Sequence, residues 1–562
     1  MDITCYEHDR GFVIQQFREG NFDYVDAAHE VVETEFFRFI HGKRYLQELA
    51  ETYPTPRKKQ DVPTWFYLCS NLSMRLHGVH SFHAYPYVVR CGGMLNAFGP
   101  TVAHKAEHPE TGDVTLSCAG FNNKNDYKRQ TPCDQDFLRK LAKDTDTNAL
   151  ETWFNRDVAL LLKRHKLFDR EGIFIGDGSY VFVPDNEEYE NSTRLLFDAS
   201  GHPVTSAEIK NMTPEQAARC EWMRCYKLVS LLHTDRKGMF ALRVAARLLP
   251  GNAHECPVLY ELVDQFILCV GPGVMKRLIN DRGFLDGEQI AHCKRDHGID
   301  TLIPLRKNMD LYQDVLGLLG LPEVKFAPYR PPEREPVDAP RLPEAPPRIQ
   351  KRERKRQATV KAKKAEIPPP PPSETLVRSE VAGIGDLRSW SSCTVPLNVV
   401  VSREMYADGH EDIWMLADTK PLDAKHNPAR SRDDYVLRTR IEEGHRHLKC
   451  FWDLASFTSR AFSLVLNQII FVMLAHNLLQ VFLLRQGRAK LNRRTRPRVL
   501  DQLLPTNTVI IIYYENRFAT VSPLAYTELV LTLEEEARKK ILAKTQQLRR
   551  QMAHELEPAR PP

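Results

Sequence analysis

The stretch from residue 435 to residue 449, YVLRTRIEEGHRHLK, decides the fold that we expect for this chain. Four of its residues recur at helical spacing: Tyr435, Arg438, Glu442 and Lys449. At about 100° per residue they fall within an arc of about 60° on one helix face. A carboxylate flanked by arginine and lysine, with a tyrosine near it, suits contact with phosphates and a metal ion.

Chance is the competing explanation of this spacing. Exposed helices often carry i,i+4 charge pairs, which need no functional reason. In a chain of this composition, however, the whole pattern starts at some tyrosine by chance with odds of about one in a hundred or less. We therefore interpret the stretch as a candidate site helix.

Two aspartates follow short apolar runs upstream of this helix. Residues 173–175 (IFI) lead into Gly176-Asp177-Gly178, and residues 276–280 (KRLIN) lead into Asp281. We expect each aspartate to end a strand and to project over the carboxyl edge of a sheet. Each one alone is also an ordinary turn residue. Together with Glu442 they supply three oxygen ligands that can share two Mg²⁺ ions, as phosphodiester chemistry requires.

The sequence between the two aspartates alternates between strand and helix patterns. Strands are predicted at 225–233 and 239–249, as a hairpin, and at 276–280 and 301–305. Helices are predicted at 255–270 and 286–297, the second beginning at the N-cap Asp286 and ending at Gly298. This alternation predicts an α/β layer.

The chain resembles the DDE insertion-sequence transposases, which have an RNase H-like core. The resemblance is carried first by the pattern Tyr-x2-Arg-x3-Glu-x6-Lys at 435–449. The sequence around each aspartate also agrees, with IGDGS at 175–179 and NDRGF at 280–284. Two further segments agree, LPGNAHE at 249–255 and IPLRKN at 303–308. The resemblance covers about residues 170–310 and 395–485. It departs at Thr439, where the family often has tryptophan.

The resemblance implies a role for each site residue. Asp177, Asp281 and Glu442 would be the catalytic acids and would hold two Mg²⁺ ions, with Mn²⁺ as a substitute. Arg438 and Lys449 would hold phosphates of the transposon end. Tyr435 would position the DNA backbone or a displaced base.

The implied reaction is cut-and-paste transposition of double-stranded DNA. The enzyme would cleave at transposon ends and join them to target DNA, acting as a homodimer on the DNA. Glu443 is the alternative to Glu442 as the catalytic acid. It lies about 100° further round the helix, so we expect it to lie outside the helix face that the four spaced residues share.

Two other readings stay open. A decayed or domesticated transposase would keep the fold and act as a DNA-binding protein, although all three acids and the basic pair are present. Another RNase H-like nuclease, such as a junction resolvase, would not need the Tyr-Arg-Glu-Lys stripe.

The expected organisation is an α/β, RNase H-like core that is split by an insertion. The predicted parts are a mostly helical DNA-binding or dimerisation region at 1–165, the first part of the core at 166–310, an insertion at 311–430, the rest of the core at 431–490, and a small α+β region with a charged helix at 491–562. Within the insertion, 322–385 is predicted to be Pro-rich, basic and disordered, and 394–418 to be a β-hairpin.

Composition is compatible with a soluble enzyme of several folded units. The chain has 562 residues, 42% of them hydrophobic, a net charge of +5, and twelve cysteines without a C-x-x-C pair. A disulfide framework is therefore not expected. No signal peptide is expected, and we predict a cytoplasmic, nucleoid-associated protein of bacterial type.

One apolar stretch is long enough to cross a membrane. Residues 461–484 contain no Asp, Glu, Lys or Arg. The stretch nevertheless holds six polar residues: Ser463, Asn467, Gln468, His476, Asn477 and Gln480. These would be costly against lipid, so a helix buried in the protein is preferred, with no membrane partner.

The Pro-rich basic segment generates a test. It holds fourteen prolines between Pro322 and Pro372, and nine basic residues against one acid between Arg348 and Lys364. Deleting residues 348–364 should leave the core folded and Mg²⁺-dependent cleavage intact at low salt. DNA binding should weaken equally for cognate and random duplex, with a shallower salt dependence, because phosphate neutralisation carries no sequence information. Selective loss of cognate binding in a titration at several salt concentrations would contradict this electrostatic account.

Overall fold

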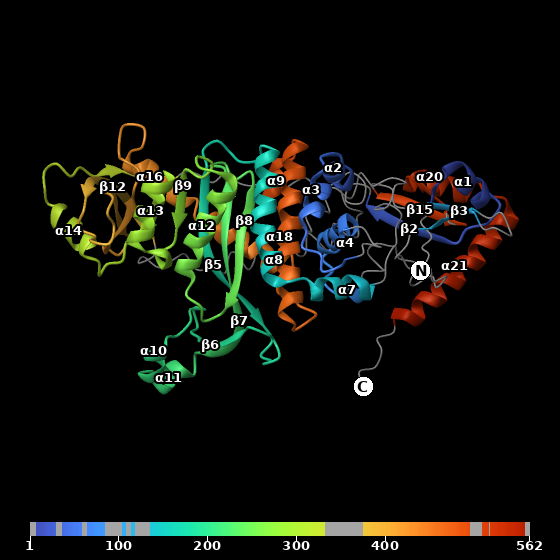
Figure 1. The fold of residues 1–562 in the computed structure, drawn as a ribbon, viewed down its shortest axis with the longest axis horizontal. Coiled ribbons are helices and arrows are strands. Elements are labelled where there is room, and N and C mark those ends of the chain that lie inside the picture. The colour runs from blue at the N-terminus through green and yellow to red at the C-terminus, as the bar shows by residue number, and fades with distance from the viewer. Residues whose placement is uncertain are drawn as a thin grey trace.

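The computed structural model describes residues 7–29, 36–58, 64–84, 104–107, 114–117, 135–331, 375–494, 499, 508–515 and 517–556. Figure 1 shows an elongated molecule. Strands from the middle of the chain lie at one end, helices form the centre, and elements from both chain ends gather at the other end.

A mixed sheet forms the core. Its central strands are β5 (Ile173–Val183), β7 (Glu221–Thr234), β8 (Ala241–Pro250), β9 (Arg277–Asn280) and β10 (Asp300–Pro304). β7 pairs antiparallel with β5 and β8, whereas β9 is parallel to both β5 and β10. All four residues of β9 are buried, as expected of a parallel strand covered on both faces. This arrangement is consistent with an RNase H-like core.

Three helices follow the core strands. They are α12 (Glu255–Val270), α13 (Gly287–His297) and α14 (Asp310–Leu318). α13 begins and ends where its sequence predicts. The Asp286 side chain accepts a hydrogen bond from the Gln289 N–H, and Gly298 adopts the left-handed conformation at the C-terminus.

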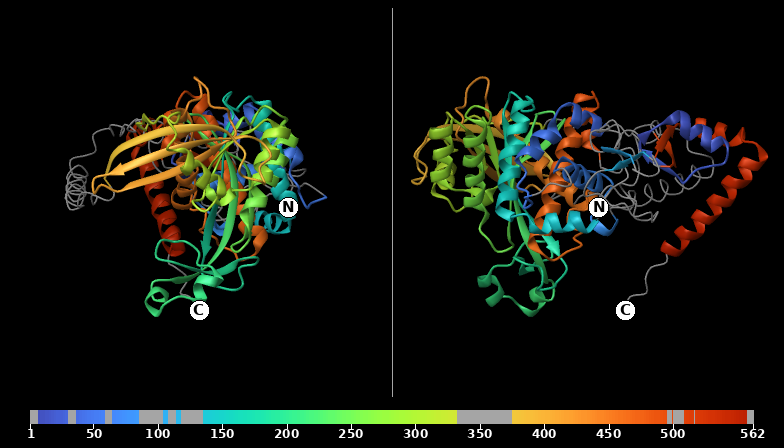
Figure 2. Two further views of the ribbon diagram at one scale, coloured as in Figure 1. Left: turned by 90° about the vertical axis from the view of Figure 1, so that its left-hand side faces the viewer. Right: turned by 45° about the vertical axis from the view of Figure 1, so that its right-hand side comes forward.

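The insertion extends the core sheet. β14 (Glu411–Asp418) pairs antiparallel with β10 and with β13 (Leu397–Tyr406), so the predicted hairpin is present as two strands of the main sheet. β13 pairs in turn with β12 (Leu376–Leu387), and β12 pairs with the short β11 (Ala327–Pro328). Figure 2 shows these long strands running out to one side of the molecule.

The predicted disorder of 322–385 is wrong at both ends of that segment. β12 begins at Leu376, four residues after the last proline of the run, and pairs with β13 almost along its length. Val381 and Ala382 are buried there. The proline-rich composition masked a strand whose partner lies further along the chain. Residues 332–374 of the predicted arm lie outside the described part of the chain.

The site helix is broken in two. α16 (Pro428–Val436) and α17 (Thr439–Phe451) are separated by a turn at Leu437 and Arg438. The N–H groups of these two residues donate to carbonyls three positions earlier, at 3.1 and 3.0 Å, instead of four. The expectation of one continuous helix face from Tyr435 to Lys449 is therefore wrong at its beginning.

The long apolar helix α18 (Phe462–Arg485) lies inside the protein. It is long and apolar enough to cross a membrane, but 89% of its most apolar 18-residue stretch is buried in the protein. Asn477 makes two hydrogen bonds, of 2.9 and 2.6 Å, with the backbone of Arg243 on β8, and Gln480 makes two, of 2.7 and 2.9 Å, with Ala241. The preference for a buried helix is borne out.

Helices from the N-terminal region belong to the same core. They are α2 (Phe37–Gly42), α3 (Tyr45–Thr52), α4 (Thr64–Leu76), α7 (Gln135–Asp144), α8 (Thr147–Trp153) and α9 (Ala159–Arg164), with a π-helical turn at Phe154–Val158. Tyr67 on α4 accepts a hydrogen bond from Asn467 on α18 at 3.0 Å. Asn155 pairs with the backbone of Ala246 on β8 through two hydrogen bonds. These helices therefore share one hydrophobic core with the sheet.

The two ends of the chain form a second, smaller unit. β2 (Tyr24–His29), β15 (Thr508–Tyr514), β16 (Arg517–Val521) and β1 (Glu7–His8) make one sheet. It packs with α1 (Arg10–Arg18), α20 (Pro523–Leu531) and α21 (Glu535–Leu556), as Figure 1 shows. The expectation of a mostly helical region at 1–165 and a separate region at 491–562 is corrected here, because pairing between distant strands leaves no local signal.

Two smaller features complete the fold. β3 (His104–Glu107) and β4 (Val114–Ser117) form an antiparallel pair. Between β5 and β7 the chain makes an excursion through β6 (Thr193–Phe197), α10 (Ser206–Lys210) and α11 (Pro214–Ala217), which projects below the core in Figure 1.

A buried ion-pair cluster joins the sheet to the site helix. The Arg277 guanidinium on β9 pairs with both oxygens of Asp418 at the end of β14, at 2.5 and 2.7 Å. Its Nε lies 3.2 Å from Asp434 on α16. Ser431 and His426 also donate to Asp418. Arg277, Asp418 and Asp434 are all at most 5% exposed.

Removing Asp418 should therefore be costly. We expect Asp418→Ala to lower the free energy of unfolding by about 3–5 kcal/mol, because it leaves a buried guanidinium without its main partner. The matched control is Asp412→Ala, which removes the partner of the exposed Lys307 and should cost at most about 1 kcal/mol. Urea unfolding at pH 7 measures both, and equal losses would contradict the argument.

The same cluster predicts a pH dependence. Burial alone would raise the pKa of Asp418, but Arg277 and the hydrogen bonds from His426 and Ser431 hold that pKa well below its usual range. The stabilisation is thus fully present above the unfolded-state carboxyl pKa of about 4 and fades as the pH falls below it. In urea unfolding repeated from pH 7 to pH 3, the stability difference between wild type and Asp418→Ala should shrink only below about pH 4.

Candidate active site

Asp177 lies within a strand and not at its end. β5 continues to Val183, and Asp177 pairs with Ser230 of β7. The expectation that the strand ends at Asp177 is therefore wrong, because the residues after Gly178 continue to pair with β7 as far as Val183. The carboxyl group is held by a hydrogen bond of 2.9 Å from the Gly178 N–H, and the side chain is 14% exposed.

Asp281 follows β9 directly, as predicted. Its carboxylate accepts a hydrogen bond of 2.6 Å from the Arg282 N–H at the start of a short 3₁₀ turn. β9 is parallel to β5, and Asn280 is in register with Gly176. Asp177 and Asp281 are thus the next residues after a paired position on neighbouring strands.

Arg438 links Glu442 to Asp281. The Arg438 guanidinium lies 3.4 Å from Asp281 Oδ2 and 2.5 Å from Glu442 Oε1. One turn further along α17, His445 Nε2 lies 3.8 Å from Asp177 Oδ2. The turn before α17 therefore meets Asp281 through Arg438, and α17 meets Asp177 through His445, so the segment that carries Glu442 lies beside both aspartates.

Glu443 faces another part of the protein. It lines a cavity of about 790 Å³ together with Arg440, Gly444 and His447 of the same helix. Its carboxylate lies 3.9 Å from Arg440. Glu442 and Glu443 thus lie on different faces of α17, as the angle between them predicts.

Tyr435 and Lys449 flank the acids. The Tyr435 ring lies 6.1 Å from the ring of Trp414 on β14 and 5.9 Å from the Arg438 guanidinium, and burial raises the pKa of its hydroxyl to about 12. Lys449 donates to Ser179 Oγ at 2.6 Å, two residues beyond Asp177. Burial lowers the pKa of Lys449, while the Asp177 carboxylate opposes this effect.

The electrostatics around Asp177 favour a bound cation. Burial raises the pKa of Asp177 to about 7, Arg438 opposes the rise, and the carboxylates of Asp281 and Glu255 add to it. A cation bound beside Asp177 would stabilise the charged form of this carboxyl, as Arg438 does in part. The donor set consists of hard oxygens, which Mg²⁺ prefers, so the residues fit a divalent metal ion.

Glu255 also lies at the candidate site, although no role for this residue was predicted from the sequence. It is the first residue of α12, and a Cβ placed on Gly178 would clash with its Oε2. A Cβ on Gly283 would lie 3.5 Å from its other oxygen, so the carboxylate sits between the segments that follow the two aspartates. Lys227 Nζ lies 3.5 Å away. An acid in the first turn is common in helices, so its sequence signal was weak.

The comparison with known families gives the class of protein to which this fold belongs. The family model described as the transposase DDE domain matches residues 190–478, just over half of the chain. The chain belongs to this family, whose members cleave and transpose DNA with the help of divalent metal ions. The matched region includes Asp281 and Glu442, whereas Asp177 precedes it. No curated protein matches the chain.

The close packing of the Leu259 and Asn280 side chains against Gly176 of β5 gives a test of the site. A Cβ on Gly176 would lie 2.5 Å from Leu259 and 2.7 Å from Asn280 Oδ1. Gly176→Ala should therefore displace the Leu259 side chain of α12 and the Asn280 side chain, which directly precedes Asp281, and slow Mg²⁺-dependent cleavage about 10²-fold. Overpacking should also cost about 1–3 kcal/mol of stability. Gly317→Ala, on a helix with open space at that position, is the control for cleavage. Wild-type cleavage by Gly176→Ala would contradict this geometry.

Proposed function

We propose that this protein is an active cut-and-paste transposase that cleaves double-stranded DNA at the ends of its element and joins those ends to target DNA. The proposal rests on one observation above all. Arg438, in the turn before α17, contacts Asp281 and Glu442, and His445 of α17 lies 3.8 Å from Asp177. The segment that carries Glu442 therefore lies beside both aspartates. A helix kept only for its surface charge would not need this placement.

The three acids are the proposed metal ligands. Asp177, Asp281 and Glu442 would hold two Mg²⁺ ions, with Mn²⁺ as a substitute. When bound, such ions activate a water or 3′-hydroxyl nucleophile and stabilise the leaving oxygen of the phosphodiester. The protein's contribution is to keep the carboxylates at the sheet edge and to screen their repulsion with Arg438.

The basic groups are proposed to hold DNA phosphates. Arg438 is 19% exposed and lies beside two carboxylates, so it can contact a phosphate at the same edge. Lys449, held near Ser179, stands on the Asp177 side. Tyr435 is set against Trp414 and is proposed to position the DNA backbone or a displaced base.

The cavity behind α17 extends the proposed DNA path. Five basic residues line it: Arg236, Lys237, Arg440, Lys490 and Arg493. Clustered lysines and arginines attract a phosphate backbone without reading its sequence. We infer that DNA lies along both sides of α17, bound by a homodimer, and that the protein acts on the nucleoid in the bacterial cytoplasm.

The two adjacent glutamates provide the sharpest test. Glu442→Gln should reduce Mg²⁺-dependent cleavage of end DNA by at least 10³-fold, because it removes a charge from the metal site, while end binding stays within a few-fold. Glu443→Gln is the matched control on the same helix: it removes a charge from the cavity and not from the metal site, so cleavage of saturating end DNA should stay within a few-fold of wild type. A gel assay on duplexes made from DNA flanking the reading frame, where inverted repeats are expected, measures both activities.

The outcomes separate the competing functions. Equal cleavage by wild type and Glu442→Gln would exclude the assigned acid. Tight end binding with no cleavage by the wild-type protein, in either Mg²⁺ or Mn²⁺, would favour a decayed transposase that acts as a DNA-binding protein. Cleavage of four-way junctions in preference to linear ends would favour a resolvase.

A further inference from the structure

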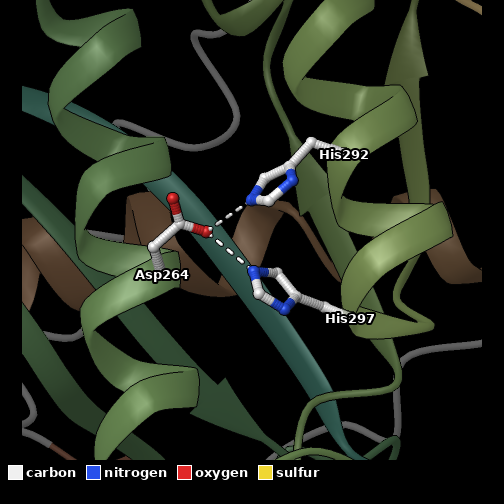
Figure 3. Close-up of side chains that lie close together, drawn as sticks. All are labelled: Asp264, His292 and His297. Carbon is white, nitrogen blue, oxygen red and sulfur yellow. Dashed lines mark hydrogen bonds and ion pairs between the residues drawn. The ribbon is translucent and has the colours of Figure 1, made fainter.

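A second cluster of metal-ligating side chains lies away from the three acids. Asp264 on α12 and His292 and His297 on α13 converge, as Figure 3 shows. The Asp264 Oδ1 atom lies 3.1 Å from His292 Nε2 and 2.8 Å from His297 Nε2. Among the described residues, this is the group of three whose ligand atoms all lie within 4.8 Å of one another.

A fourth residue orients one of the imidazoles. The Asp296 carboxylate lies 2.6 Å from His292 Nδ1, on the far side of the ring from Asp264. A carboxylate on one ring nitrogen holds the proton there and leaves the other nitrogen free to ligate, which is the usual support of a metal-bound histidine. The cluster thus has a supporting residue as well as three ligands.

We propose that Asp264, His292 and His297 form a zinc site that ties α12 to α13. Four-coordinate Zn²⁺ with bonds of about 2.0–2.1 Å separates its ligand atoms by about 3.3 Å. The two oxygen–nitrogen distances of 2.8 and 3.1 Å need to lengthen by only a few tenths of an ångström. Water takes the fourth position.

The ligand types separate this site from the catalytic one. Two imidazoles favour zinc and its neighbours, whereas Mg²⁺ prefers oxygen ligands. Millimolar Mg²⁺ should therefore occupy the acids without displacing zinc from the imidazoles. The two helices that the zinc ion joins begin beside the catalytic edge: Glu255 is the first residue of α12, and α13 follows Asp281 after a short turn.

A metal-free explanation of the cluster is the alternative. The hydrogen bond to Asp296 raises the pKa of His292 against the lowering effect of its partial burial. A protonated His292 could then pair with Asp264 as a surface ion pair. This alternative predicts no uptake of zinc, so a binding measurement distinguishes it from the proposal.

Zinc uptake by the full chain in excess Mg²⁺ tests the proposal. After treatment with a chelator, wild type should bind one more Zn²⁺ ion per chain than His297→Gln or Asp264→Asn, as counted by equilibrium dialysis. Asp296→Asn should keep the site with about 10–100-fold weaker affinity. His202→Gln, which removes a histidine that is 78% exposed on a loop, is the matched control and should bind as wild type does.

Two further readouts can be taken on the wild-type protein, so they remain informative if a variant fails to fold. Zinc should raise the Tm of wild type and not that of His297→Gln. Co²⁺ added to wild type alone should give the visible absorption of a tetrahedral site. Equal zinc uptake by wild type and His297→Gln, or complete displacement of zinc by Mg²⁺, would overturn the proposal. Loss of cleavage in Glu442→Gln bears on the proposed function and not on this site.

Discussion

The buried pairing of Arg277 with Asp418 is the interaction on which the geometry of the site depends. Arg277 begins β9, four residues before Asp281, and Asp418 ends the last strand of the insertion. The guanidinium also reaches Asp434 on α16, four residues before Arg438. One cation therefore sets the position of the second aspartate relative to the segment that carries the glutamate. Buried charges are costly to desolvate, so we attribute their presence to positioning and not to net stability.

The insertion contributes to this geometry because it continues the sheet. The chain between Asp281 and Glu442 is long, but β14 returns to pair with β10, next to β9. α16 therefore starts close to the catalytic edge whatever the length of the preceding arm. The same strand supplies Trp414, which packs against Tyr435 and against the Arg432 guanidinium at 4.1 Å. The insertion is thus a structural part of the candidate site.

Local signals made much of this predictable. Asp286 and Gly298 marked the ends of α13, and helical spacing placed Glu442 and Glu443 on different faces of α17. Features that depend on distant pairing were missed. β12 forms by pairing with β13, and β2 by pairing with β15. Glu255 joins the acids because α12 packs against Gly176 and Gly178 of β5. The break at Leu437 and Arg438 also left no signal, since neither glycine nor proline stands there.

The polar atoms of α18 explain how an apolar helix serves the site. In the described sheet β8 pairs with β7 alone, so one side of its backbone needs other partners. Asn477 and Gln480 of α18, with Asn155, supply them. This pairing holds Arg243 of β8 in place, and its buried guanidinium lies 3.1 Å from where a Cβ on Gly444 would stand. Glycine at 444 lets α17 approach this strand closely, between Glu443 and His445. The amides that make α18 unsuited to lipid therefore support α17, which carries Glu442, through β8. The Arg277 cluster holds α16, which precedes α17.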